Sequence, residues 1–315
     1  MKEKISVIIP TYNSETYLKR LLNNIYENKN IEIIIINDAS NDNTDKLIKE
    51  YPNIKYYKNK KNKGIAYSRN KGIELVETKY FTFIDSDDEV DSEIFNIMYN
   101  ECEDNNLDMC ICNYKEIINN QEIKSKYTYN NEIYNNKQLL EETFKDKIST
   151  VVWAKLYKTK TYKDIKFNEE LRLNEDYEYI IRCFLKSKKI KIINKYLYKY
   201  NKNNTSITNN LTCKIVKDNN YLYCLNNLNL NIFNNYNYFI NINELRNIHT
   251  YIKCIDKKNI YTYLKKEINK DKLKSLLKTN LSIFNKLEII IFIISIRLYI
   301  LIYPLLIKIK NLIRR

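Results

Sequence analysis

Short apolar runs alternate with amphipathic segments along the first 85 residues of the chain. Four of these runs have the length and the β-branched or aromatic composition of buried strands. They are residues 5–9, 31–36, 54–57 and 80–84. The segments between them repeat apolar positions every three or four residues, as in Leu18, Leu21, Leu22 and Ile25, which predicts helices. Apolar strands alternating with helices favour a parallel sheet covered on both faces, so an α/β fold is expected.

A cluster of polar residues follows each of the four predicted strands, directly or within a few residues. In a parallel sheet the carboxyl ends of the strands share one edge, and ligands bind there in open α/β folds. The four loops are therefore expected to converge on a single crevice.

The last of these clusters contains Asp85, Asp87 and Asp88, three carboxylates within four positions. Holding three negative charges at the end of a buried strand costs repulsion and desolvation. A bound cation offsets that cost, and Mg²⁺ and Mn²⁺ prefer hard oxygen ligands. We therefore expect a divalent cation here, held against a phosphorylated ligand. The plainer interpretation is a solvated loop that also caps the next helix.

The second half of the chain is less regular. Residues 108–113 form a further expected strand, in which Cys110 and Cys112 pack as small apolar residues. A helix is expected at 136–147 and another strand at 190–200, with a hairpin or variable loop at 116–132. We place a domain boundary after residue 212, where a mainly helical C-terminal extension, residues 213–315, begins.

Two scarce residue types exclude several kinds of site. The two glycines, Gly64 and Gly72, cannot build a dinucleotide-binding loop or a P-loop. One histidine, His249, excludes HExxH zinc sites, and we interpret it as a packed or helix-surface residue. The seven cysteines have irregular spacing, which indicates reduced thiols and a cytosolic compartment.

The chain ends in an apolar stretch, residues 287–307, interrupted by Glu288, Ser295, Arg297 and Pro304. It is long enough to span a bilayer, but a central arginine costs about 2.5–3.5 kcal/mol there. The last 45 residues also hold nine lysines and arginines against two acids. We therefore favour a helix lying on an anionic membrane surface. A single span and an internally packed helix remain alternatives.

Four motifs in this order resemble the family 2 glycosyltransferases of the GT-A fold. They are Ser6–Asn13, Ile36–Ser40 with Asp42 and Thr44, Asn62–Ala66 continuing to Arg69 and Asn70, and Asp85–Asp88, which contains a DxD motif. The resemblance covers about residues 5–180. It implies a Rossmann-like, mostly parallel sheet flanked by helices, a nucleotide-sugar donor, a divalent cation (Mn²⁺ or Mg²⁺) and inversion at the anomeric carbon.

The resemblance also assigns residues to the donor side. Pro10, Thr11 and Tyr12 would line the nucleotide pocket, Asp38 would bind the nucleobase and Arg69 would lie on the nucleotide side. Asp85 would lie near the ribose, Asp87 would bind the metal, and Asp88 is the alternative ligand. Taken alone, Asp38 could equally form an Asx turn or cap a helix.

On the acceptor side, Asp176 resembles the general base of the family, with Glu175 in reserve. A carboxylate suits this role because it can accept the proton of an acceptor hydroxyl. An acid in a first helical turn is also favoured by the helix dipole. Trp153 and Lys155 resemble an acceptor-side run, although Trp153 could simply pack in the core. Residues 203–208, with Ser206, resemble a loop that closes over the donor.

The expected function is an inverting, metal-dependent, hexosyltransferase-like enzyme on the cytosolic membrane face. It would use a nucleotide sugar, expected to be a UDP-sugar, and a glycan or lipid-linked acceptor in surface polysaccharide synthesis. Two alternatives stay open: a nucleotidyl- or phosphoryltransferase using the acidic cluster, and a non-catalytic basic membrane-surface protein. Binding to nucleic acid is not expected, because an acidic crevice without metal repels phosphates.

Overall fold

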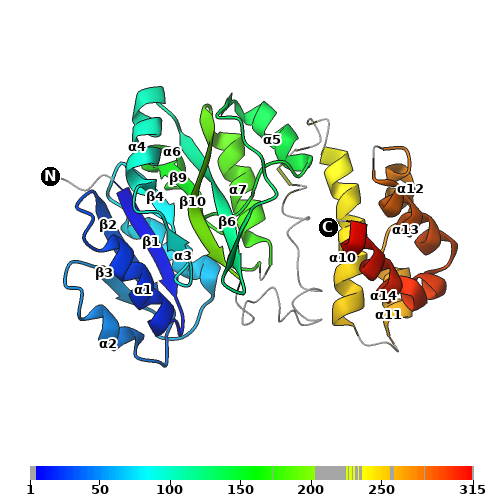
Figure 1. Cartoon of the computed structure of the whole chain (residues 1–315), viewed down its shortest axis with the longest axis horizontal. Helices are drawn as coiled ribbons and strands as arrows, with labels where there is room; N and C mark the ends of the chain where they lie inside the picture. The colour runs from blue at the N-terminus through cyan, green and yellow to red at the C-terminus, as the bar shows by residue number, and fades with distance from the viewer. Residues whose placement is uncertain are drawn as a thin grey trace. The chain divides into compact units, whose positions relative to one another are not determined.

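The computed structural model describes residues 5–171, 173–202, 225, 227, 228, 230, 233, 236–255, 259–279 and 281–313. The chain divides into two compact units, residues 1–206 and 207–315, close to the expected boundary. The first is an α/β unit and the second is helical (Figure 1). The expected loop at 203–208 lies outside the described residues.

The first unit is built on one ten-stranded sheet in the order β3-β2-β1-β4-β9-β6-β10-β5, with β7 paired to β6 and β8 to β10. Its strands are β1 (Ile5–Thr11), β2 (Ile31–Asn37), β3 (Lys55–Lys58), β4 (Tyr80–Phe83), β5 (Glu89–Val90), β6 (Met109–Ile118), β7 (Gln121–Lys124), β8 (Ile133–Tyr134), β9 (Lys155–Lys158) and β10 (Ile190–Asn201). The four strands predicted first, β1 to β4, are parallel, and β6 is parallel to β10.

Helices connect these strands and cover the sheet. They are α1 (Glu15–Ile25), α2 (Thr44–Ile48), α3 (Ile65–Leu75), α4 (Ile94–Asn105), α5 (Asn136–Phe144), α6 (Thr159–Tyr162) and α7 (Glu175–Lys186). The expected α/β fold, with a sheet between helices, is confirmed, but the sheet is mixed and not mostly parallel.

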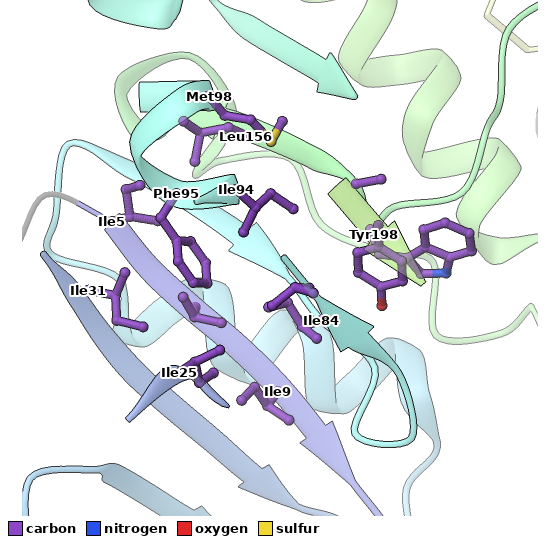
Figure 2. Close-up of a cluster of buried hydrophobic side chains, with 14 of the residues drawn as sticks. Ile5, Ile9, Ile25, Ile31, Ile84, Ile94, Phe95, Met98, Leu156 and Tyr198 are labelled. Atoms are coloured by element: carbon purple, nitrogen blue, oxygen red, sulfur yellow. The ribbon is translucent and has the colours of Figure 1, made fainter. Parts of the chain in front are cut away.

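Strands β1, β2 and β4 are buried on both faces, as their apolar composition requires. On β1, Ile5, Val7 and Ile9 point to one side, into a core cluster that α1 and α4 supply with Ile25 and Phe95 among others (Figure 2). Cys110 and Cys112 are buried in the same cluster, which confirms that they pack as small apolar side chains. Ile8 of β1 points to the other side of the sheet, where it faces α3.

The sheet departs from the sequence expectation in its middle. Strand β9 lies between β4 and β6 and is antiparallel to both, so the sheet is mixed.

The segment 116–132 contains a hairpin, one of the two expected alternatives, in which Asn119 and Asn120 both have positive φ between β6 and β7. Two successive residues of this kind form the primed turn that suits a right-twisted hairpin.

Left-handed backbone positions are occupied mostly by asparagine in this chain. Among the described residues, six of the nine non-glycine positions with positive φ are asparagines: Asn13, Asn106, Asn119, Asn120, Asn131 and Asn174. Asparagine tolerates this conformation better than other non-glycine residues because its short amide bonds locally. These positions take the place that glycine fills in most proteins.

The second unit contains α10 (Tyr236–Cys254), α11 (Ile260–Glu267), α12 (Lys270–Leu276), α13 (Ile283–Ile294) and α14 (Ile296–Ile313), which enclose their own apolar core. His249 contacts this core, with Nε2 3.2 Å from Oε1 of Glu288, as the interpretation of a packed residue implied. Across the residues described here, no helix combines the length and apolarity of a membrane span.

We predict that Gly72→Ala destabilises the α/β unit. A Cβ at Gly72 would lie 2.3 Å from Cγ2 of Ile8, so the helix α3 must shift away from β1. Overpacking of this kind costs about 1–3 kcal/mol in the free energy of unfolding, measurable by urea denaturation.

The Ile8→Ala background is the control for this prediction, because it removes the methyl group that clashes. There Gly72→Ala should be neutral or stabilising, since alanine favours helix over glycine. Equal losses in both backgrounds would show that the contact with Ile8 is not the cause.

Candidate active site

One arginine joins the segments that carry the predicted acids. The guanidinium of Arg69, on α3, lies 3.1 Å from Asp85, 3.4 Å from Glu175 and 2.5 Å from Asp176. Asp85 follows β4, whereas Glu175 and Asp176 begin α7. The structure thus brings the acidic motif and the proposed base into one cluster, which we call the Arg69 cluster.

The chain around Arg69 is held rigidly by its neighbours. The Asn70 side chain donates to the carbonyl of Phe167 at 3.0 Å and accepts from its N–H at 2.7 Å. The Phe167 ring lies 5.4 Å from the Arg69 guanidinium and stacks on Tyr179 of α7 at 3.8 Å. These contacts fix α3 against the segment that leads into α7, so the carboxylates at the start of α7 reach the sheet edge.

The charges within the Arg69 cluster do not balance. Three carboxylates share one guanidinium that is only 2% exposed. Burial raises the pKa of Asp176 to about 8; the nearby Glu175 and Asp85 act in the same direction, and Arg69 opposes them. A carboxyl group with such a pKa can accept and release a proton near neutral pH.

The remaining two acids of the motif have different surroundings. Asp88 is fully buried; it accepts from the Tyr198 hydroxyl at 2.7 Å and from the N–H of Asn201 at 2.8 Å. Burial holds the pKa of Asp88 well above its usual range, and the charges of Asp85 and Asp87 add to this effect. Asp88 therefore fastens the acidic turn to β10, while Asp87 is partly exposed.

The residues present fit a divalent cation at Asp87 better than at Asp88. Both oxygens of Asp88 are bonded within the protein, and Asp85 is paired with Arg69. Within the described part of the chain, no three His, Cys, Asp or Glu side chains gather in a metal-binding arrangement. Mg²⁺ often takes only one or two protein carboxylates and completes its shell with water and substrate phosphates, so one partly exposed carboxylate is compatible with it.

On the expected nucleotide side, Asp38 organises the loop after β3. Its carboxylate accepts hydrogen bonds from Asn59 at 2.7 Å, from the N–H of Lys63 at 2.8 Å and from the N–H of Gly64 at 2.7 Å. Asp38 is 4% exposed, so its first role is to hold this loop in place. Its contact with a nucleobase stays a prediction.

The loop after β1 contains the other residues expected on the nucleotide side. Pro10 and Thr11 are buried in β1, whereas the ring of Tyr12 is 47% exposed just beyond the strand. The hydroxyl of Ser14 bonds those of Thr11 and Ser86, both at 2.9 Å, which ties the loop after β1 to the loop after β4.

The loop after β2 joins this group through asparagine. The N–H of Asn13 donates to the Ser40 hydroxyl, and the Asn13 side chain accepts from the N–H of Asn41. With the bonds of Asp38 to the loop after β3, all four predicted loops meet at one edge of the sheet, as expected.

Trp153 and Lys155 are interior residues. Trp153 is 4% exposed and stacks on Tyr198 at 4.5 Å, and Lys155 is fully buried with its ammonium donating to the carbonyl of Val151 at 2.6 Å. Burial lowers the pKa of Lys155 to about 7. The assignment of both residues to the acceptor side stays a prediction, and the structure gives Trp153 the packing role that was its alternative.

Three residues that support the site carry no local sequence signal. Tyr198 donates to Asp88 and its oxygen accepts from the N–H of Asp85 at 3.2 Å, although it lies more than 100 residues away in β10. Asn201 and Asn59 bond the Asp87 carbonyl and the Asp38 carboxylate. Asparagine is so common in this chain that its occurrence alone does not indicate a site.

A family profile and two of the curated relatives that match this chain all describe glycosyltransferases. The profile described as "Glycosyl transferase family 2" matches residues 6–165, half of the chain. Glycosyltransferase GlyA of Streptococcus pneumoniae is 30% identical over 212 residues, covering 63% of this chain and 30% of GlyA. The uncharacterized glycosyltransferase EpsJ of Bacillus subtilis is 26% identical over 65% of this chain and 62% of EpsJ. The chain therefore matches less than two thirds of the length of these relatives.

Among solved structures, residues 1–349 of Staphylococcus aureus TarS in complex with UDP-GlcNAc superpose with a TM-score of 0.59 at 19% identity. The match covers 94% of this chain and 82% of that one. At this identity the likeness shows the fold, which is the GT-A fold expected from the sequence.

We predict that Arg69→Met lowers the free energy of unfolding by about 3–5 kcal/mol, because it leaves three carboxylates without their shared cation. Urea denaturation measures this loss. The loss should shrink as the pH falls from 8 towards 5, because the native carboxyl groups then bind protons that the unfolded chain does not.

Arg20→Met is the matched control. Arg20 pairs with Glu89 at 3.2 Å, but its side chain is 47% exposed. Removing an exposed pair costs about 1 kcal/mol or less. If Arg69→Met lowered the free energy of unfolding by no more than Arg20→Met, the Arg69 cluster would not hold α3, β4 and α7 together as we describe.

Proposed function

The chain belongs to glycosyl transferase family 2, and from that premise we propose that it transfers a sugar from a UDP-sugar to a hydroxyl of a glycan or lipid-linked acceptor. We further propose a role in surface polysaccharide synthesis. The observation that carries the proposal is the Arg69 cluster, in which the DxD motif and the acids of α7 meet at the sheet edge.

Similar proteins support this substrate class. TarS of Staphylococcus aureus, 28% identical over 62% of this chain, is named a poly(ribitol-phosphate) β-N-acetylglucosaminyltransferase. GgaB of Bacillus subtilis is named a minor teichoic acid biosynthesis protein. These names describe bacterial cell-surface polymers. Transfer of N-acetylglucosamine or another hexose by this chain is part of the proposal.

In the proposed reaction, Asp176 accepts the proton of the acceptor hydroxyl. The hydroxyl oxygen forms its bond to the anomeric carbon on the face opposite the diphosphate. The bond between that carbon and the diphosphate oxygen breaks, and its electron pair leaves with the nucleoside diphosphate, which inverts the configuration. The raised pKa of Asp176 makes it a stronger base than an ordinary aspartate.

Arg69 is a positioning residue in this proposal. It bonds Asp176 on one side and Asp85 on the other, so it sets the separation between the base and the donor-binding turn. Precise placement of reacting groups accounts for a large part of enzymatic rate enhancement.

The donor is proposed to bind along the loops after β1, β2 and β4. The exposed ring of Tyr12 offers a face for the base, and Asp85 lies where the ribose is expected. Asp87 would hold Mg²⁺ or Mn²⁺, which when bound supplies positive charge to the departing diphosphate. Asp88 supports this turn from behind through Tyr198 and Asn201.

We expect Asp176→Asn to reduce kcat for sugar transfer by about 100- to 10,000-fold with little change in donor binding, because an amide cannot accept the proton. In the wild type, kcat/KM should rise with pH up to about 8, since Asp176 must be deprotonated to act. Steady-state kinetics across this pH range measure both effects.

Glu175→Gln is the matched control, one residue away and in the same cluster. It should reduce the rate less than Asp176→Asn. A larger loss for Glu175→Gln would indicate that Glu175, and not Asp176, is the general base. Full activity of both variants would show that neither residue of α7 is the base.

We also expect UDP-sugars to raise the apparent melting temperature, and to do so more strongly with Mn²⁺ present. Ligand at 100 times Kd stabilises the native state by about 2.7 kcal/mol. Thermal shift with UDP-GlcNAc, UDP-glucose and the corresponding GDP- and CDP-sugars measures the preference. Asp87→Asn should remove the Mn²⁺-dependent part alone. No shift with any donor would contradict the proposed function.

A further inference from the structure

Helices α13 and α14 carry a row of exposed apolar side chains that the catalytic proposal does not use. Eight of them follow one another at intervals of three and four residues, which places them on one face of each helix. This apolar stripe comprises Ile283, Leu287, Ile290, Ile294, Leu298, Leu301, Leu305 and Ile309. Ile283, Ile294 and Leu301 are each at least 75% exposed.

The opposite sides of the same helices are also apolar, but they are buried. Ile289, Phe292, Tyr299 and Tyr303 pack in the core of the second unit. The apolar stripe is therefore additional to what this unit needs for its own core. Large contiguous apolar surfaces are rare on soluble monomers and mark sites of interaction.

The charges that interrupt this stretch in the sequence do not interrupt the stripe. Glu288 is fully buried beside His249 and Tyr299. The guanidinium of Arg297 lies 4.9 Å from the ring of Tyr261 on α11. In the sequence, a charge among apolar residues argued against a helix that spans the membrane. That argument does not apply to the exposed apolar stripe.

Cations lie along one edge of the stripe. Lys286, Arg297 and Lys308 each directly precede a stripe residue, at Leu287, Leu298 and Ile309. Neighbouring residues of a helix point about 100° apart, so the three cations lie on the same side of the stripe on their helices. Apolar residues beside a row of lysine and arginine are the pattern of a helix that lies in a membrane interface.

We propose that the apolar stripe lies in the interface of an anionic bilayer, with its side chains among the acyl chains and Lys286 and Lys308 at lipid phosphates. Charge complementarity selects this occupant. The last 45 residues hold nine lysines and arginines against two acids, so an anionic surface attracts them. A second copy pairing through the same face would bring like charges together. This inference goes beyond the proposed sugar transfer and does not depend on it.

Vesicle flotation of the full chain tests the proposal, with phosphatidylcholine vesicles and with equimolar phosphatidylcholine and phosphatidylglycerol. The wild type should float with the anionic vesicles. Lys286→Gln and Lys308→Gln should each weaken this binding about fivefold, because one cation near an anionic surface contributes about 1 kcal/mol. Ile294→Glu combined with Leu301→Glu should abolish it.

The matched control is Ile123→Glu combined with Ile133→Glu, two isoleucines of the first unit that are 47% and 44% exposed. These substitutions should leave flotation unchanged. A Leu301→Trp variant adds a second readout: the native Trp153 is buried, so anionic vesicles should shift only the emission of the new residue to shorter wavelength.

Three results would overturn the proposal. One is wild-type protein that floats with neither vesicle, and another is flotation that survives Ile294→Glu with Leu301→Glu. The third is a dimer, seen by light scattering without lipid, that the same double substitution converts to monomers; the stripe would then be an interface between copies of this chain.

Discussion

The site depends on one electrostatic constraint, a buried guanidinium shared by three carboxylates. Arg69 bonds Asp85 at the end of β4 and Asp176 at the start of α7, which lie far apart in the sequence. An arginine suits this position because its planar fork remains charged when buried and can bond several oxygens at once. One cation cannot neutralise three acids, so the charges of Glu175 and Asp85 add to the effect of burial, which is the main cause of the raised pKa of Asp176.

The parallel strands set the direction of the loops, and short polar bonds set their position. Ser14 joins the loops after β1 and β4, Asn13 joins those after β1 and β2, and Asp38 holds the loop after β3. Asp88 extends the same network to β10 through Tyr198. The sheet therefore supplies a stiff base, and side chains from distant segments lock the polar edge that would receive the donor.

The predictable parts of this protein are those with local causes. Apolar runs identified β1 to β4, and the acidic motif lies at the edge of the sheet where the four predicted loops meet. The sequence did not predict strand β9, because it begins with Lys155 and no local pattern indicates a lysine that donates to a carbonyl in the protein interior. In the sequence, Asp87 and Asp88 are equally plausible metal ligands. Only the fold shows that the carboxylate of Asp88 accepts a hydrogen bond from the Tyr198 hydroxyl. Likewise, the sequence shows Glu288 only as a charge within an apolar stretch, whereas the structure shows that it is buried beside His249.

The asparagines at left-handed positions have an effect on how the chain folds as a unit. A glycine at such a turn has no side chain, so it contributes nothing to distant contacts. Here the Asn13 amide accepts from Asn41, Asn131 accepts from the N–H of Asn194, and Asn106 accepts from Lys158. Each turn is thus completed by a bond to a remote segment, and asparagine also has fewer unfolded conformations than glycine. At Asn13, Asn106 and Asn131, a change that disrupts the turn therefore also removes a contact with a distant segment.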